Sequence, residues 1–153
     1  MKFTRAPGGG RAPGAARLTD EITYLDLAVG RFRLALVARA VLFVQQDVAM
    51  RADFTLAGAP VPLCDLAEAF GAGPRASLPF VIVCEAAGRV AAFGVDGVGH
   101  LRPREAPKMS RVPSFGLARP AVIAGALRDG ERLLMVVEPA ALVELAHETA
   151  RRI

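Results

Sequence analysis

Few side chains in this sequence are suited to catalysis or metal binding, and none is spaced for either. The two histidines, His100 and His147, do not lie at the spacing of metal ligands. Ser77, Ser110 and Ser114 occupy no nucleophile-elbow pattern. No pair of carboxylates stands out, and no dinucleotide fingerprint follows an expected strand. We therefore expect no catalytic residue, no metal site, no cofactor and no enzymatic activity.

Asp65 ends a run of alternating apolar residues in the stretch APVPLCDLAEAFG, residues 59–71. Glu68 follows three residues later, and Gly71 closes the segment. An aspartate at the N-cap accepts backbone N–H groups, a glutamate at N3 reaches back to the cap, and glycine suits the left-handed position after the last turn. The pattern predicts a short helix capped by Asp65 and no catalytic role for this residue.

Asp96 lies in the stretch FGVDGVGHL and has two interpretations. The Asp-Gly pair could form a turn. Alternatively, Val95 and Val98 belong to strand segments on either side of a kink, with Asp96 exposed at its edge. A position of this second kind could contact a partner protein.

Basic residues are concentrated at the start of the chain. Residues 1–18 carry four of the 19 Lys and Arg residues and no acid, and they are predicted to be a flexible Gly/Pro/Ala-rich tail. Residues 19–153 form one predicted domain, with 15 basic against 15 acidic residues. A domain without net charge does not attract the phosphate groups of nucleic acids, so no nucleic-acid partner is expected. The alternative is a small β-barrel that binds nucleic acid through the tail, although aromatic residues for base stacking are scarce.

The cysteines and the apolar runs indicate a cytoplasmic protein. Cys64 and Cys84 lie in apolar surroundings without CxxC spacing, so we expect two reduced core thiols. The longest nearly apolar run, residues 34–44, contains Arg39 and falls short of the roughly 20 residues that span a bilayer. No membrane insertion is expected.

Alternating apolar residues and frequent turn signals predict a mostly β fold of barrel type. Residues 22–44 are typical of a hairpin that turns at Gly30 and continues into another strand, although helical spacing also fits residues 34–44. The other expected elements are two short strands hinged at residues 58–60, strands at 80–84 and 89–95 around a turn at 87–88, a loop over 102–120, a hairpin turning at 129–130, and a helix over 139–153.

Three patterns occur along the chain in a characteristic order. They are G-x-x-V-P-L-x-D-L at residues 58–66, V-D-G-V at 95–98, and the apolar hairpin I-x-G…L-L-M-V-V at 123–137. Each is weak alone. Together, over roughly residues 22–145, the chain resembles the CheW-like family of chemotaxis coupling domains.

This resemblance implies two small SH3-like, five-stranded β-barrels sharing an apolar core, with a short internal helix and a C-terminal helix. It also implies a non-enzymatic adaptor that couples a chemoreceptor or another input to the regulatory domain of a CheA-type histidine kinase. Short apolar strand edges are suited to barrel-to-barrel contacts with that kinase domain or with another CheW-like protein.

The chain departs from the family pattern at positions that the family uses for receptor and array contacts. Ala57 stands where the family has the arginine of N-x-R-G, and Leu42 stands where a glutamate is common. Residues 45–55 leave the family's Pro-led helical turn shortened or missing. The resulting partner-binding candidates are Leu42, Val44, Ala57, Gly58, Asp96, Gly97 and Val98.

The consecutive residues Leu42, Phe43 and Val44 leave two interpretations open. If their strand is exposed, they form an apolar patch suited to another protein. If it is buried, they are ordinary core residues.

Overall fold

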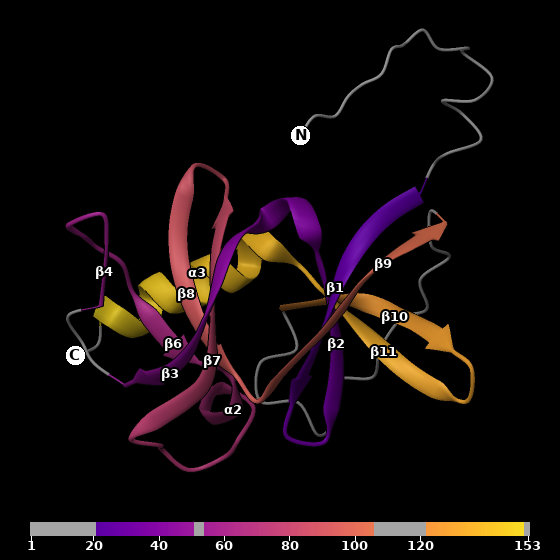
Figure 1. The fold of residues 1–153 in the computed structure, drawn as a ribbon, viewed down its shortest axis with the longest axis horizontal. Helices are drawn as coiled ribbons and strands as arrows, with labels where there is room; N and C mark the ends of the chain where they lie inside the picture. Colours follow the sequence, from indigo (N-terminus) through magenta and orange to yellow (C-terminus); the bar gives the residue numbers. More distant parts are fainter. Residues whose placement is uncertain (1–20, 51–53, 106–121, 152–153) are drawn as a thin grey trace, which may run out of the picture.

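The computed structural model describes residues 21–50, 54–105 and 122–151, which form two larger sheets, a small hairpin and two helices (Figure 1). The predicted mostly β fold with an internal and a C-terminal helix is therefore confirmed. The helices are α2 (Leu66–Ala69) and α3 (Pro139–Arg151), and the 3-10 turn is η1 (Ala38–Ala40). The strands are β1 (Glu21–Val29), β2 (Phe32–Val37), β3 (Val41–Ala49), β4 (Thr55–Leu56), β5 (Ala59–Pro60), β6 (Leu63–Asp65), β7 (Ser77–Ala86), β8 (Arg89–Val95), β9 (Gly97–Glu105), β10 (Ile123–Asp129) and β11 (Arg132–Val137).

The larger sheet has five strands in the order β10-β11-β2-β1-β9. β1 and β2 form the predicted hairpin, in which Gly30 has a φ of 57°. This left-handed conformation favours glycine, which has no Cβ. β11 pairs in parallel with β2, so the C-terminal hairpin joins the N-terminal one. The turn between β10 and β11 comes one residue later than predicted, because Asp129 still pairs with Arg132.

The smaller sheet has four strands in the order β3-β7-β8-β6. The predicted turn between β7 and β8 lies at Ala87 and Gly88, whose φ angles are 54° and 76°. Positive φ at both central residues is what a type I′ hairpin turn requires. The β4–β5 segment packs beside this sheet, where Leu56 contacts the cluster that contains Val81 and Val83.

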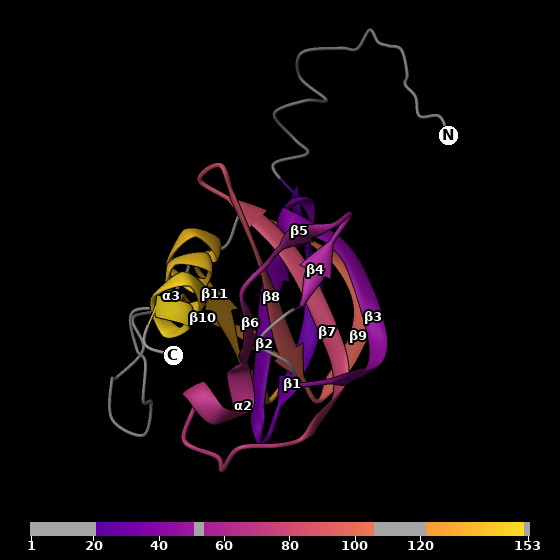
Figure 2. The ribbon, with the colours of Figure 1, turned by 90° about the vertical axis from the view of Figure 1, so that its left-hand side faces the viewer.

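One apolar core joins both sheets and α3. Leu27 and Leu34 of the larger sheet, Phe93 of the smaller sheet and Leu142 of α3 belong to the same buried cluster. Burial of each such side chain stabilises the fold by roughly 1.5–3 kcal/mol. Figure 2 shows α3 on one side of the molecule and β3 on the opposite side.

The two closed five-stranded barrels implied by the resemblance are not what the described residues form. The larger sheet ends at β9 and β10, and the four-stranded sheet ends at β3 and β6, so both sheets are open in this part of the chain. β6 has three residues, and Pro103 leaves β9 without an N–H donor at one position. Strands with these features are poorly suited to close a barrel.

The structure also decides two further expectations, one about the type of an element and one about the start of a loop. Residues 34–44 form β2, η1 and the start of β3, so the strand interpretation is confirmed and the helical one is wrong. Residues 102–105 continue β9 because they pair with β1, so the expected loop begins later. The rest of that loop, residues 106–120, and the predicted tail, residues 1–18, lie outside the described residues.

Candidate functional site

Leu42 and Val44 lie on β3, the edge strand of the smaller sheet. Their side chains are 45% and 38% exposed, whereas Phe43 packs inward against the cluster that contains Val81 and Val83. This alternation follows from the two-residue period of a strand. The exposed interpretation therefore holds for Leu42 and Val44, and the core interpretation holds only for Phe43.

The outer side of β3 has no neighbouring strand in the sheets that the structure describes. Edge strands in natural proteins usually carry charges or prolines that discourage a further strand. Residues 41–46, VLFVQQ, contain neither. β3 is bulged between Val41 and Phe43, and its pairing with β7 is interrupted again at Asp47, which has a φ of 53°. Residues 41–46 are thus suited to pair with a strand of another protein.

Asp96 occupies the junction where the chain passes from β8 in the smaller sheet to β9 in the larger one. The Asp96 N–H donates to the Ala28 carbonyl over 2.8 Å. The Asp96 carboxylate accepts hydrogen bonds from the Gly30 N–H and the Arg75 guanidinium. The kink interpretation therefore holds for Asp96, and its side chain is 31% exposed.

The ionisation of Asp96 reflects these contacts. Burial acts to raise the pKa of its carboxyl, but the Gly30 N–H and the Arg75 guanidinium outweigh this effect and hold the pKa below its ordinary value. The carboxylate is consequently charged at neutral pH and accepts hydrogen bonds from both the Gly30 N–H and the Arg75 guanidinium.

Arg75, which the sequence analysis missed, links Asp96 to Asp65. Its Nε–H donates to Asp65 Oδ2 over 2.9 Å, and its Nη2 donates to Asp65 Oδ1 over 2.7 Å. Hydrogen bonds to Asp65 and Asp96 raise the pKa of the guanidinium, although burial opposes them. In the sequence Arg75 stands in a Gly/Pro loop, where no local pattern indicates these partners.

The predicted N-cap role of Asp65 is confirmed. Its carboxylate accepts the Ala67 N–H over 3.1 Å at the start of α2, and Gly71 follows the helix with a φ of 108°. Asp65 is 3% exposed. A carboxylate buried this deeply needs a charged partner, and Arg75 supplies it.

Ala57 and Gly58 form the turn between β4 and β5. Both are exposed, with φ angles of 52° and 83°. The left-handed region costs a residue other than glycine roughly 1–2 kcal/mol, so Ala57 holds a strained backbone conformation. The predicted hinge therefore exists, one residue earlier than expected.

Gly97 and Val98 begin β9 and pack closely against the rest of the fold. A Cβ on Gly97 would lie 3.4 Å from the Cβ of Ala28, and Val98 is half-buried against the main core. The seven candidate residues thus lie on three separate parts of the fold: the β3 edge, the β4–β5 turn and the β8–β9 junction.

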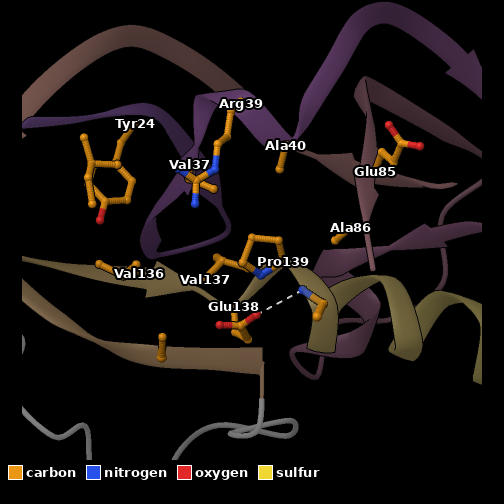
Figure 3. A pocket seen from close by; sticks show the side chains of 13 residues that line it. Tyr24, Val37, Arg39, Ala40, Glu85, Ala86, Val136, Val137, Glu138 and Pro139 are labelled. Atoms are coloured by element: carbon orange, nitrogen blue, oxygen red, sulfur yellow. Dashed lines mark hydrogen bonds between the residues drawn. The ribbon is translucent and has the colours of Figure 1, made fainter. Parts of the chain in front are cut away.

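A pocket of about 540 Å³, also missed by the sequence analysis, lies between the two sheets and the start of α3 (Figure 3). Apolar side chains such as Val37 and Val136 form much of its wall. Arg39, Glu85 and Glu138 add charged groups, and Glu138 Oε1 accepts the Ala140 N–H over 3.1 Å, which caps α3. The lining comes from segments far apart in the sequence, so no local pattern predicts the pocket.

Tyr24 gives this pocket a neutral polar group. It is 4% exposed, and burial raises the pKa of its hydroxyl, although Arg104 and Arg39 oppose this shift. Asp26, two residues further along β1, is also buried and pairs with Arg102, whose Nε lies 3.0 Å from Asp26 Oδ2. Tyr24 thus adds a largely buried, neutral phenol to the lining of this pocket.

Both cysteines are buried thiols, as predicted, and burial raises the pKa of Cys84 to about 12. His147 is half-buried with its Nε2 3.1 Å from the Val90 carbonyl oxygen, because α3 packs on β8. Within the described ranges, no cluster of three or more His, Cys, Asp or Glu residues is placed to hold a metal ion. None of the helices in those ranges has the length and apolar character to cross a membrane.

Comparison with known proteins shows which family and which solved structure this chain is similar to. The scaffolding protein TtCheW from Thermoanaerobacter tengcongensis has a similar structure, with a TM-score of 0.65 at 20% sequence identity. The match covers 77% of this chain and 84% of that one, and at this identity it shows the fold alone. No curated protein matches the sequence. A family model described as the CheW-like domain matches residues 34–147, which is most of the chain. The protein is therefore a member of the CheW-like domain family.

Proposed function

We propose that this protein is a non-enzymatic cytoplasmic adaptor that couples a chemoreceptor or another input to a CheA-type histidine kinase. The observation that carries this proposal is the exposed apolar edge of β3 in a CheW-like fold. Leu42 and Val44 are exposed there, and residues 41–46 carry no charge. An exposed apolar edge is a site for another protein and not a catalytic site.

The chemistry of this edge supports a contact with the kinase. The regulatory domain of a CheA-type kinase is expected to have a related fold with strand edges of its own. Main-chain hydrogen bonds from such an edge to β3 supply attraction, and Leu42 and Val44 supply apolar contact beside them. The absence of charge in residues 41–46 removes the usual obstacle to a further strand.

The input partner would use a different surface. The pocket between the sheets presents apolar walls with Arg39 and Glu85 among them, a combination suited to an amphipathic segment of a receptor. Asp96 and the two residues after it lie at the other end of the β1–β2 hairpin from this pocket, so they would contact a separate part of a partner.

The test is size-exclusion chromatography with light scattering, followed by a binding titration. It uses the full chain and the regulatory domain of the CheA-type kinase from the same genome. A stable complex is expected, and Leu42→Lys or Val44→Lys should weaken it by roughly tenfold or more, because each buries a charge at the contact.

Leu133→Lys is the matched control. Leu133 is 56% exposed but lies on β11 in the other sheet, so its substitution should leave the affinity unchanged. Absence of a complex at high micromolar concentration would overturn the kinase partner. Equal weakening by all three substitutions would overturn the β3 interface.

A further inference from the structure

A small apolar cleft lies where the turn between β1 and β2 meets α2, and its volume is about 120 Å³. Figures 1 and 2 both show α2 beside this turn. The cleft, called the Gly30 cleft below, lies at the opposite end of the β1–β2 hairpin from the pocket that Tyr24 lines. The described residues that line it are glycine or apolar: Val29, Gly30, Phe32, Ala67, Phe70 and Ala72.

The walls of the Gly30 cleft are fixed by contacts that the fold already makes. The rings of Phe32 and Phe70 pack edge to face, with their centroids 5.5 Å apart and their planes at 79°. The Asp96 carboxylate accepts hydrogen bonds from the Gly30 N–H and from Arg75, which belongs to the loop after α2. One carboxylate therefore holds both the turn and the loop in place. A cleft that is formed in advance lowers the cost of binding.

The size of the Gly30 cleft limits what it can hold. Pockets for drug-sized ligands measure roughly 300–1,000 Å³, which is well above the volume of this cleft. Dry apolar cavities of roughly 150 Å³ bind benzene, so the cleft suits one group about the size of a phenyl ring or a branched aliphatic side chain. A single group of this size gains little affinity alone. It is best supplied by a protein side chain whose neighbours make further contacts.

A charged group beside the cleft indicates what should flank that side chain. Arg31 is exposed, and its guanidinium carbon lies 5.2 Å from the centroid of the Phe32 ring. None of the ion pairs found among the described residues involves Arg31. A guanidinium donates well to a carboxylate, so an acidic residue next to the apolar one would complement this edge of the cleft.

We propose that the Gly30 cleft is an anchor site for one phenyl-sized or branched apolar side chain of a protein partner. In the partner, an acidic residue stands next to that side chain and pairs with Arg31. The cleft contains no residue of the β3 edge, so this site does not depend on the proposed kinase contact.

The experiment is an NMR titration of the full chain with isotope-labelled alanine methyl groups. Benzene alone, added up to its solubility in water, should shift the methyl signals of Ala67 and Ala72 in a saturable way. The blocked dipeptide acetyl-Asp-Phe-amide should shift the same signals and bind roughly two- to fivefold more tightly than acetyl-Lys-Phe-amide, as expected of an exposed ion pair. Acetyl-Asp-Ala-amide lacks the ring and should bind roughly tenfold more weakly or worse.

Two pairs of variants separate the cleft from the rest of the surface. Ala72→Leu fills the cleft and should abolish the shift of the Ala67 signal, whereas Ala76→Leu, exposed in the same loop but outside the lining, should bind the probes like the unchanged chain. Arg31→Gln should remove the preference for the acidic dipeptide, and Arg132→Gln, exposed on β11, should retain it. Circular dichroism confirms that each variant folds.

Four outcomes would overturn the proposal. Benzene and acetyl-Asp-Phe-amide could leave both methyl signals unmoved, or Ala72→Leu could bind the probes as well as the unchanged chain does. Benzene could bind while acetyl-Asp-Phe-amide does not, which would make the cleft a site for free small molecules only. Equal affinities for the acidic and basic dipeptides would remove the role of Arg31. None of these results involves the kinase, so failure here is distinguishable from failure of the adaptor function.

Discussion

At the scale of single residues, buried carboxylates joined to arginines connect segments that are distant in sequence. Asp65 and Asp26 are 3% and 5% exposed, and their partners are Arg75 and Arg102. The capping role of Asp65 could be predicted because a cap and its helix are neighbours in the chain. Its pairing with Arg75 could not, because only the folded loop returns the guanidinium to the helix start.

Replacement of Arg75 tests how much this connection contributes. Arg75→Ala should lower the free energy of unfolding by about 3 kcal/mol, since the Asp65 carboxylate stays buried without its charged partner. Urea unfolding at neutral pH measures this change. Arg132→Ala removes an exposed guanidinium and should change the value by less than about 0.5 kcal/mol. Similar losses in both variants would show that the Arg75 contacts add nothing specific.

At the scale of elements, the hairpins were predictable and the exposure of their strands was not. Gly30 and the pair Ala87-Gly88 mark turns through local chemistry, which the sequence displays directly. Exposure depends on which strand lies at a sheet edge, and this is decided by tertiary pairing. The exposure of Leu42 and Val44 therefore depends on the position of β3 at the end of the smaller sheet, which no local pattern indicates.

Close packing between neighbouring strands of the smaller sheet can be tested at Gly94. A Cβ added there would lie 2.8 Å from both methyl carbons of Leu78, which is fully buried. Gly94→Ala should therefore lower the free energy of unfolding by about 1–3 kcal/mol through overpacking. Urea unfolding measures the loss.

Gly73→Ala is the control for Gly94→Ala, because no atom lies within 4 Å of the added Cβ. A second check is the double variant Gly94→Ala, Leu78→Val. It should be less destabilised than the sum of its single substitutions, since the smaller side chain relieves the contact. Strict additivity would contradict overpacking as the cause.

At the scale of the whole molecule, the two sheets are joined by the path of α3. The helix continues directly from β11 in the larger sheet, yet its contacts are with β8, β7 and β6 in the smaller one. The apolar core contains residues from both sheets and from the helix, among them Leu34, Phe93 and Leu142. The helix was predictable from its periodicity, but this bridging position depends on the sheet order and was not.

Bridging by α3 predicts that both sheets lose stability together. Leu142 is 1% exposed, and Leu142→Ala should cost about 2–5 kcal/mol, because it removes core contacts and leaves a cavity. Hydrogen exchange followed by NMR should then show faster exchange in the β1–β2 hairpin and the β7–β8 hairpin by the same factor, since one shared core protects both. Glu144→Ala, on the exposed side of the same helix, removes only exposed ion pairs with Arg89 and Arg151 and should change both hairpins far less. Faster exchange confined to β7 and β8 would instead mean that the sheets open independently, and that the helix stabilises only the sheet it covers.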